Sequence, residues 1–257
     1  MRLSRLIIPV AALLFAACAV DDGPTVNNRP QLAGVRFINA LADEGPVDAR
    51  MIDQTEWHAF ALAINFRQSG PVWPTEAGTR KVRVWRSTTN LDSMALLIEQ
   101  DVTIEANKNV TLLLTGSVQA NTARIEIIPD VVPDSSAGQI HIRAVNTMAG
   151  AADVSWVDAN GASAPVSVSP LGQTSYQSRA AGEVKARFAA AGAADAAAPK
   201  GAPEAGGIGA TAGYSTSGSA LSAYLFPASV VGSRAPAAFT TPGVVWFVDR
   251  VPAPPRS

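Results

Sequence analysis

The feature that most constrains the fold of this chain is an internal repeat, because short motifs of its first half recur in the second half in the same order and at nearly constant spacing. The matched segments are 35–42 with 142–149, 48–53 with 153–158, 66–69 with 171–174, 77–84 with 181–188, and 130–133 with 249–252. Self-similarity of this kind indicates one structural unit used twice. The sequence therefore predicts two tandem modules, residues 34–133 and 138–252.

Within each copy, apolar residues alternate with polar ones, as in a strand with one buried and one solvated face. Residues 81–84 (Lys-Val-Arg-Val) and 140–142 (Ile-His-Ile) follow this pattern. Residues 110–114 and 244–248 are more continuously apolar, interrupted only by Thr111, which is typical of strands covered on both faces. Turn-forming residues separate the short runs, so we expect an all-β fold of two tandem antiparallel β-sandwich-like, immunoglobulin-like modules.

The second copy carries an insertion, residues 189–213, that consists almost entirely of Ala, Gly, Pro and Asp. Such small side chains bury little apolar area, so we expect a mobile loop that contributes nothing to the core. An alanine-rich helix is the alternative, but Gly192, Pro199, Gly201 and Pro203 would interrupt it.

Residues 1–17 have the pattern of an export signal that is removed from the mature protein. Two arginines precede an apolar run, residues 6–15, that is too short to cross a bilayer as a stable helix. A Phe-Ala-Ala-Cys sequence ending at Cys18 resembles the lipobox of bacterial lipoproteins, with Phe where Leu is usual. The resemblance implies a diacylglycerol on Cys18 and cleavage before it. A plain secretory signal cut near Ala17 or Ala19 is the alternative.

Cys18 is the only cysteine, so no disulfide forms within the chain, and an unmodified lone thiol is a liability in an oxidising compartment. Each buried CH₂ of an acyl chain contributes about 0.8 kcal/mol, so several chains anchor a protein firmly. Residues 18–33 are polar and rich in turn formers, which predicts a flexible tether, and residues 253–257 form a tail. By resemblance to lipoprotein sorting rules, Ala19 rather than Asp after the cysteine favours the outer membrane, if the host has one.

Three motifs resemble a domain of unknown function, DUF family 4397. They are Val-Arg-Phe-Ile-Asn-Ala at 35–40, Pro-Val-Asp at 46–48, and Ala-Gly at 77–78 before a basic-apolar strand. The family is common in bacterial secreted proteins and lipoproteins, often in tandem. The resemblance covers most of 34–133 and, more loosely, 138–252. It implies a β-sandwich-like module outside the cytoplasm and supplies no activity, cofactor or catalytic residue.

The charge balance of the chain argues against several classes of partner. Its formal net charge is -1, and loss of residues 1–17 removes two of the 20 basic residues, which leaves 18 basic against 21 acidic residues. Long-range attraction to nucleic acid or to an anionic lipid surface is therefore not expected. The expected partners are the membrane, through a lipid on Cys18, and an unidentified protein or glycan.

The chain offers few residues for a metal or catalytic site, and we expect no cofactor. Its two histidines, His58 and His141, lack the spacing of a zinc site, and His141 is expected on the solvated face of its strand. Four acids recur in both copies: Asp48, Asp53, Asp153 and Asp158. Paired acids in loops could hold calcium, but calcium takes about six to eight oxygen ligands, more than the acids of one copy supply. Acids more commonly form hydrogen bonds with the backbone of their own turn.

Other features that sometimes mark sites are weak here. Residues 213–218 only loosely resemble a nucleophile elbow, and residues 207–209 lack the strand and helix of a dinucleotide loop. The five tryptophans could form a sugar-stacking platform, but aromatic residues in sheets are mainly core or half-buried. They are Trp57, Trp73, Trp85, Trp156 and Trp246.

The sequence thus predicts a membrane-tethered, non-catalytic lipoprotein of the cell envelope that has a binding or structural role and no catalytic, cofactor-binding or metal-binding residue. Two alternatives stay open. A carbohydrate-binding or adhesion module would expose two or more tryptophans on one patch. A hydrolase with an unrecognised site would need a deep pocket with convergent acids or a Ser-His pair.

Overall fold

The structure is a computed structural model that describes residues 30–53, 61–90, 94–189, 196–197 and 217–250. All its strands lie in one compact unit, residues 31–257. This described part is all-β, contains no helix, and has four sheets that form two modules, which confirms the predicted fold class at this level. The predicted signal segment, Cys18, most of the predicted tether and the predicted tail lie outside the described residues.

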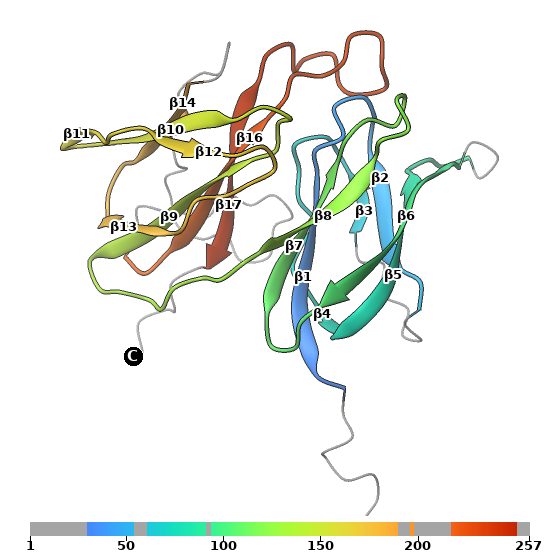
Figure 1. Ribbon diagram of the computed structural model, residues 1–257, viewed down its shortest axis with the longest axis horizontal. Coiled ribbons are helices and arrows are strands. Elements are labelled where there is room, and N and C mark those ends of the chain that lie inside the picture. The colour runs from blue at the N-terminus through green and yellow to red at the C-terminus, as the bar shows by residue number, and fades with distance from the viewer. Residues whose placement is uncertain (1–29, 54–60, 91–93, 190–195, 198–216, 251–257) are drawn as a thin grey trace, which may run out of the picture. The chain divides into compact units, whose positions relative to one another are not determined.

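The first module consists of strands β1 to β8 in two four-stranded sheets (Figure 1). One sheet has the order β4 (Trp73–Glu76), β1 (Leu32–Asn39), β7 (Asn109–Thr115) and β8 (Arg124–Pro129). The other has the order β3 (Ala61–Ile64), β2 (Val47–Met51), β5 (Gly78–Arg86) and β6 (Leu96–Ile104). Buried side chains of both sheets, such as Phe37 on β1 and Val84 on β5, belong to one apolar core.

The second module consists of strands β9 to β17. One sheet has the order β13 (Gln177–Ala180), β9 (Gln139–Asn146), β16 (Ala220–Phe226) and β17 (Gly243–Arg250). The other has the order β11 (Gly161–Ala162), β10 (Ala152–Asp158), β14 (Lys185–Phe188) and β15 (Ala196–Ala197), and β12 (Val166–Val168) also pairs with β10. Trp156 on β10 and Leu221 on β16 belong to the core that these two sheets share.

The strand pairing is not wholly antiparallel, which corrects the prediction from the sequence. In each module the opening strand pairs in parallel, β1 with β7 and β9 with β16. The other described strand pairs are antiparallel. A parallel pair joins strands that are distant in the sequence, so alternation within one strand carries no information about it.

The two modules place their strands in matching registers. Arg36 on β1 lies opposite Thr111 on β7, and Arg143 on β9 lies opposite Ser222 on β16. Arg36 aligns with Arg143 in the repeated motifs, so these pairings make Thr111 and Ser222 equivalent positions. The match of the two modules therefore extends to strands that the motif comparison had not aligned.

One short segment of the sequence alignment is shifted in the structure. We had aligned residues 66–69 with residues 171–174, which sets Ser69 against Thr174. In the structure, Ser69 and Gln173 are the residues that form bridges to equivalent positions on β1 and β9. The alignment was therefore wrong by one residue, because a short turn segment contains too few constrained positions to set its own register.

Burial along β7 and β17 differs, although both strands were predicted to be covered on both faces. Residues 110–115 of β7 are all buried, because β7 lies in the middle of its sheet. In β17, at the edge of its sheet, only Trp246 is buried and the other residues are half-buried. The prediction for 110–114 is confirmed. Both faces of β17 are covered as well, because Val244, Trp246 and Val248 pack in the core of the module and Val245 and Phe247 pack against a second apolar cluster, but β17 is buried less deeply than β7.

The insertion 189–213 lies largely outside the described residues. Ala196 and Ala197 within it form the short strand β15, which pairs with β14. The predicted loop therefore includes at least one short strand, and its mobility stays a prediction.

Candidate functional site

Strands β1 and β9 are buried on both faces, although the alternation at 140–142 predicts one solvated face for β9. Alternate residues of these strands face the core of their own module. On the opposite face, Arg36 is 3% exposed, Ile38 is 0% exposed and Arg143 is 1% exposed. These second faces are buried because side chains of the two modules contact one another.

One part of this contact is an apolar cluster with members from both modules. Its aliphatic members from the first module include Ile38, Leu113 and Ile128, and its members from the second include Val145, Tyr224 and Phe226. The Tyr224 ring packs edge-on against the Phe247 ring, with 5.2 Å between the centroids. Burial of such aromatic side chains contributes strongly to association.

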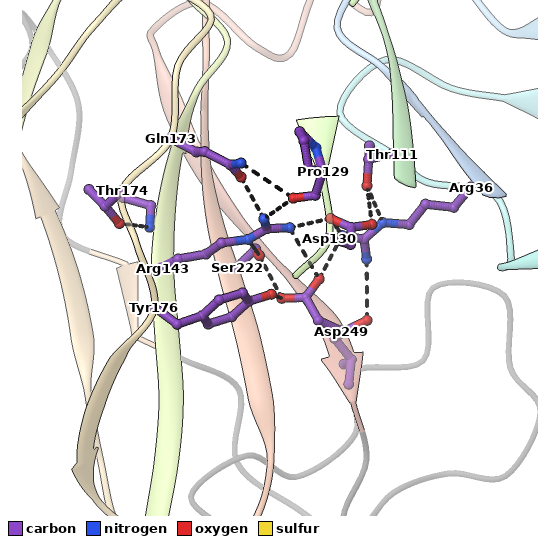
Figure 2. A network of polar contacts seen from close by, with 12 residues as sticks. Arg36, Thr111, Pro129, Asp130, Arg143, Gln173, Thr174, Tyr176, Ser222 and Asp249 are labelled. Carbon is purple, nitrogen blue, oxygen red and sulfur yellow. Dashed lines mark hydrogen bonds and ion pairs between the residues drawn. The ribbon is translucent and has the colours of Figure 1, made fainter. Parts of the chain in front are cut away.

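Beside this cluster lies a set of polar side chains that we call the charge network (Figure 2). It comprises Arg36, Thr111 and Asp130 from the first module and Arg143, Ser222 and Asp249 from the second. Within the first module, Arg36 Nε donates to Thr111 Oγ1 at 2.7 Å, and the Thr111 hydroxyl donates to Asp130 Oδ2 at 2.8 Å. The second module repeats these two bonds from Arg143 Nε to Ser222 Oγ, at 2.6 Å, and from Ser222 to Asp249 Oδ2, at 2.5 Å.

The arginine of each module forms an ion pair with the aspartate of the other module. Arg36 Nη2 donates to Asp249 Oδ1 at 2.6 Å, and Arg143 Nη2 donates to Asp130 Oδ1. The Nη1 atom of each arginine also donates to the backbone carbonyl of Val248 or Pro129, the residue before that aspartate, at 3.3 Å and 2.7 Å respectively. Equivalent residues thus make equivalent contacts in both directions, which is the geometry of a two-fold, isologous interface.

The four charged side chains of the network are almost entirely withdrawn from water. The exposed fraction of the side chain alone is 4% for Arg36, 7% for Asp130, 2% for Arg143 and 1% for Asp249. Two cations face two anions, so the buried charge sums to zero. A buried ion pair tolerates the loss of water only when each charge is both paired and hydrogen-bonded, as all four are here.

The electrostatic environment keeps the network fully ionised on its cationic side. Burial alone would lower the pKa of Arg36 and of Arg143, but the charges of Asp249 and Asp130 raise both pKa values above the ordinary value. Burial and the neighbouring Asp249 also raise the pKa of Tyr176, so its hydroxyl stays protonated and donates to Asp249 Oδ2 at 2.7 Å. The Arg143 guanidinium carbon lies 4.8 Å from the centroid of the Tyr176 ring.

This arrangement suits recognition between modules rather than proton transfer. An arginine does not release its proton in a protein. Each aspartate accepts hydrogen bonds from a hydroxyl and from the arginine of the other module. The network therefore has partners for its charges from within the chain and joins the two modules.

A second polar contact between the modules is centred on Glu44, whose side chain is 1% exposed. It accepts hydrogen bonds at 2.8 Å from Arg86 of the first module and from Arg234 of the second, and at 2.9 Å from the backbone of Gly45. Burial alone would raise the pKa of Glu44, but these hydrogen bonds outweigh it, with that from Arg86 the largest, and lower the pKa.

The connection between β16 and β17, residues 227–242, makes this end of the contact asymmetric. Arg67 of the first module donates at 2.6 Å to the carbonyl oxygens of both Pro227 and Thr241 in this connection. The Arg67 guanidinium carbon also lies 4.5 Å from the centroid of the Phe239 ring. The equivalent connection between β7 and β8 is held instead by its own module, through hydrogen bonds to Asp43.

His141 is buried, with 4% of its surface exposed, and not solvated as the sequence predicted. The alternation around it was read correctly, but the face on which it lies is the second buried face of β9. Its Nδ1 atom lies 3.1 Å from the Ser178 hydroxyl on β13, directly across the strand pair. The other histidine, His58, lies outside the described residues.

The Ser178–His141 contact is a Ser-His pair that the sequence gave no means to find. A catalytic pair needs a partner that orients the second ring nitrogen. Here Nε2 is buried and has no hydrogen-bond partner in the described part of the chain. Unpaired buried donors are rarer than unpaired acceptors, which favours the tautomer with its proton on Nδ1. In that tautomer His141 donates to Ser178 and cannot take the serine proton.

The tryptophans do not form an exposed platform in the described part of the chain. Trp156 is 0% exposed and Trp246 is 7% exposed, with 5.8 Å between their ring centroids. Trp73 is partly buried against the core of the first module, and Trp85 is half-buried. The interpretation of these four as core or half-buried residues is confirmed, and Trp57 lies outside the described residues.

Three of the four recurring acids bond to nearby backbone or lie near a basic side chain. Asp158 accepts a hydrogen bond from the backbone of Asn160, Asp48 accepts one from the backbone of Ala63, and Asp53 lies 3.7 Å from Arg80. Within the described ranges, no group of three or more His, Cys, Asp or Glu residues is placed to hold a metal ion. The same residues include no helix that is long and apolar enough to cross a membrane.

The chain matches a known protein family over a stretch that runs from β1 into β10. Residues 33–157 match a family described as Domain of unknown function (DUF4397). This confirms the resemblance to DUF4397 over that range. The match extends past the first module into β10, so it includes three of the four charged residues of the network and ends before Asp249. No curated protein matches the chain.

The four charged residues of the network lie in the repeated motifs of the sequence, which by themselves indicate no role for them. Arg36 aligns with Arg143, and Asp130 aligns with Asp249. A charged residue inside an apolar strand is costly unless a partner neutralises it. An arginine at the same place in both copies was therefore the available signal, and the partner could not be named before the modules were seen in contact.

Proposed function

We propose that this chain is a non-catalytic lipoprotein of the cell envelope, anchored through a lipid on Cys18, in which two β modules act together in a structural or binding role. The export signal and the Phe-Ala-Ala-Cys sequence at its end support the anchor. Ala19 rather than Asp after Cys18 supports the outer membrane as its location in a host that has one. The membrane is the proposed partner at this end, and a protein or glycan is the proposed partner of the modules.

We also infer that the second module is a second DUF4397 copy and that both copies are immunoglobulin-like sandwiches. The support is the shared order of motifs and the shared pairing of the opening strand, antiparallel on one side and parallel on the other. The boundaries proposed from the sequence, 34–133 and 138–252, place the junction between β8 and β9.

The proposed structural role rests on the contacts that the buried polar side chains of the two modules make with one another. Arg36, Asp130, Arg143 and Asp249 are buried and paired with one another, and they join the modules instead of lining an open site. A reactive centre needs a group that is free to meet a substrate. No observation in the described part of the chain favours the carbohydrate-binding or the hydrolase hypothesis over this one.

The anchor is tested by metabolic labelling with a fatty acid and by fractionation of membranes. The wild-type chain should take up label and sediment with membranes, whereas Cys18→Ser should do neither, because the thiol is the acyl acceptor. A matched control is Cys18→Ser combined with Val20→Cys, which restores a thiol at the wrong place and should stay unlabelled. A wild-type chain without label contradicts the proposal.

A further inference from the structure

The two modules are joined by contacts that do not depend on their lying in the same chain. Each of the four sheets is built from strands of one module only. A single connection, from Asp130 to Gly138, leads from β8 to β9. No strand of the described residues passes from one module into a sheet of the other, so the two modules can separate and pair again without unfolding either sheet.

The polar half of the contact is self-complementary. Each module presents an arginine that reaches out and an aspartate that accepts, and each arginine is held by a hydroxyl of its own module. In geometry this is the interface of a two-fold dimer, although it occurs within one chain. Nothing in the network distinguishes a partner module of the same chain from one of another chain.

The apolar half selects which module pairs with which. Three equivalent positions, read from the strand registers, carry aliphatic residues in the first module and a smaller or aromatic residue in the second. They are Ile38 and Val145, Leu113 and Tyr224, and Ile128 and Phe247. Pairing two first modules would leave the space of the aromatic rings empty, whereas pairing two second modules would crowd it.

The contacts around residues 227–242 add to this selection. Arg67 and Glu44 of the first module bind the backbone of that connection and Arg234 within it. The equivalent connection of the first module bonds to its own Asp43 and does not reach outward in this way. The favoured partner of a first module is therefore a second module.

We propose that the face of the first module formed around Arg36, Ile38 and Leu113 is a binding surface for the second module of another copy of this chain. Two chains would exchange modules and form a dimer that keeps every contact of the monomer twice. The monomer is favoured in dilute solution, because modules linked in one chain see each other at an effective concentration in the millimolar range. This inference does not depend on the lipid anchor.

Two charge-reversal variants test the exchange in chains that begin at residue 18, carry Cys18→Ser and contain every described strand. Arg36→Glu leaves one cation against three anions in the network, and Asp249→Arg leaves three cations against one anion. When the two variants are mixed, exchange brings the Arg36→Glu module against the Asp249→Arg module and leaves the other pair of modules wild-type. Both contacts are then neutral again.

We expect the mixture, and neither variant alone, to give a species of twice the chain mass by light scattering, with a melting temperature above that of either variant. The matched control carries both substitutions in one chain, which restores the pairing internally and should stay monomeric. Mixed variants that remain monomers with unchanged melting temperatures overturn the proposal.

If either variant lacks the circular dichroism of a β protein, a second variant decides the question. Deletion of residues 132–136 from the same Cys18→Ser chain shortens the connection between β8 and β9, which disfavours closure of the modules within one chain. A dimer in which tryptophan fluorescence and melting temperature match those of the wild type supports the exchange. A folded monomer contradicts it.

Discussion

Replacing Asp249 by Asn removes one negative charge from the network and changes almost nothing else in shape. The carboxylate accepts hydrogen bonds from Arg36 at 2.6 Å, Tyr176 at 2.7 Å and Ser222 at 2.5 Å, and 1% of the side chain is exposed. An asparagine amide fills the same volume but turns two donors toward groups that also donate. Arg36 would then keep only Asp130 as an ionic partner, at 3.5 Å.

The magnitude follows from the burial of the charges. Removing one partner of a buried ion pair leaves the other charge uncompensated and destabilises a protein by about 3–5 kcal/mol. Asn keeps the side-chain volume, so no cavity contributes to this figure. For a chain of this size, the loss corresponds to a fall in melting temperature of about 6–20 °C.

A surface ion pair of the same chain provides the control. Arg83 and Glu99 form a pair with 2.5 Å between nitrogen and oxygen, but 39% of each side chain is exposed. Arg83→Gln should cost about 0–1 kcal/mol, because water and salt already screen that pair. The assay is urea denaturation followed by circular dichroism, with the free energy of unfolding compared among wild type, Asp249→Asn and Arg83→Gln.

A loss for Asp249→Asn that is no larger than the loss for Arg83→Gln would refute the reasoning. In that case the network would be neither dry nor tightly coupled. Raising the ionic strength gives a second check, because salt should weaken the Arg83 pair and leave the buried network nearly unchanged.

Three further variants probe other parts of the structure. Glu44→Gln should destabilise the chain at neutral pH. Because the pKa of Glu44 is lowered from 4.5 in the folded chain, the difference in stability between wild type and variant should shrink as pH falls through that lowered pKa. Thermal melts that show the same difference at every pH would disprove this. Asn39→Ala removes three buried hydrogen bonds of the side chain and should lower the free energy of unfolding by about 2–4 kcal/mol. Asn65→Ala removes one exposed hydrogen bond and should lower it much less. Equal losses in urea denaturation would contradict this prediction. Gly116→Ala should lower the melting temperature more than Gly78→Ala, since both have positive φ but only at Gly116 would the new Cβ meet a backbone oxygen, at 2.2 Å; the reverse order would exclude the clash.

Much of the fold could be predicted from the sequence because it depends on local patterns. Alternation at 81–84 and the largely apolar run at 110–114 predicted strands that the structure contains, and the order of the repeated motifs predicted two modules. At 244–248 the sequence predicted a strand covered on both faces but not its depth of burial, because an edge strand and a central strand can share one composition and only their place in the sheet sets how much of each is buried.

The candidate site could be predicted only in part. Arg36, Arg143, Asp130 and Asp249 were visible as aligned residues, but the hydrogen bond from Arg36 to Asp249 joins positions 213 apart in the chain. A partner at that separation is decided by the packing of the two modules, which no window of sequence contains. His141 was misjudged for the same reason.

By itself, the sequence determined the lone cysteine at position 18, the strand-forming segments and their division into two modules, and it predicts an export signal before that cysteine. These depend on composition and on periodicities that act over a few residues. Only the tertiary structure decided the parallel pairing of β1 with β7, the burial of the second face of β1 and β9, and the partners of the buried charges. Those features arise where surfaces distant in the chain exclude water from one another, and the cost of an unpaired buried charge then fixes which residues must meet.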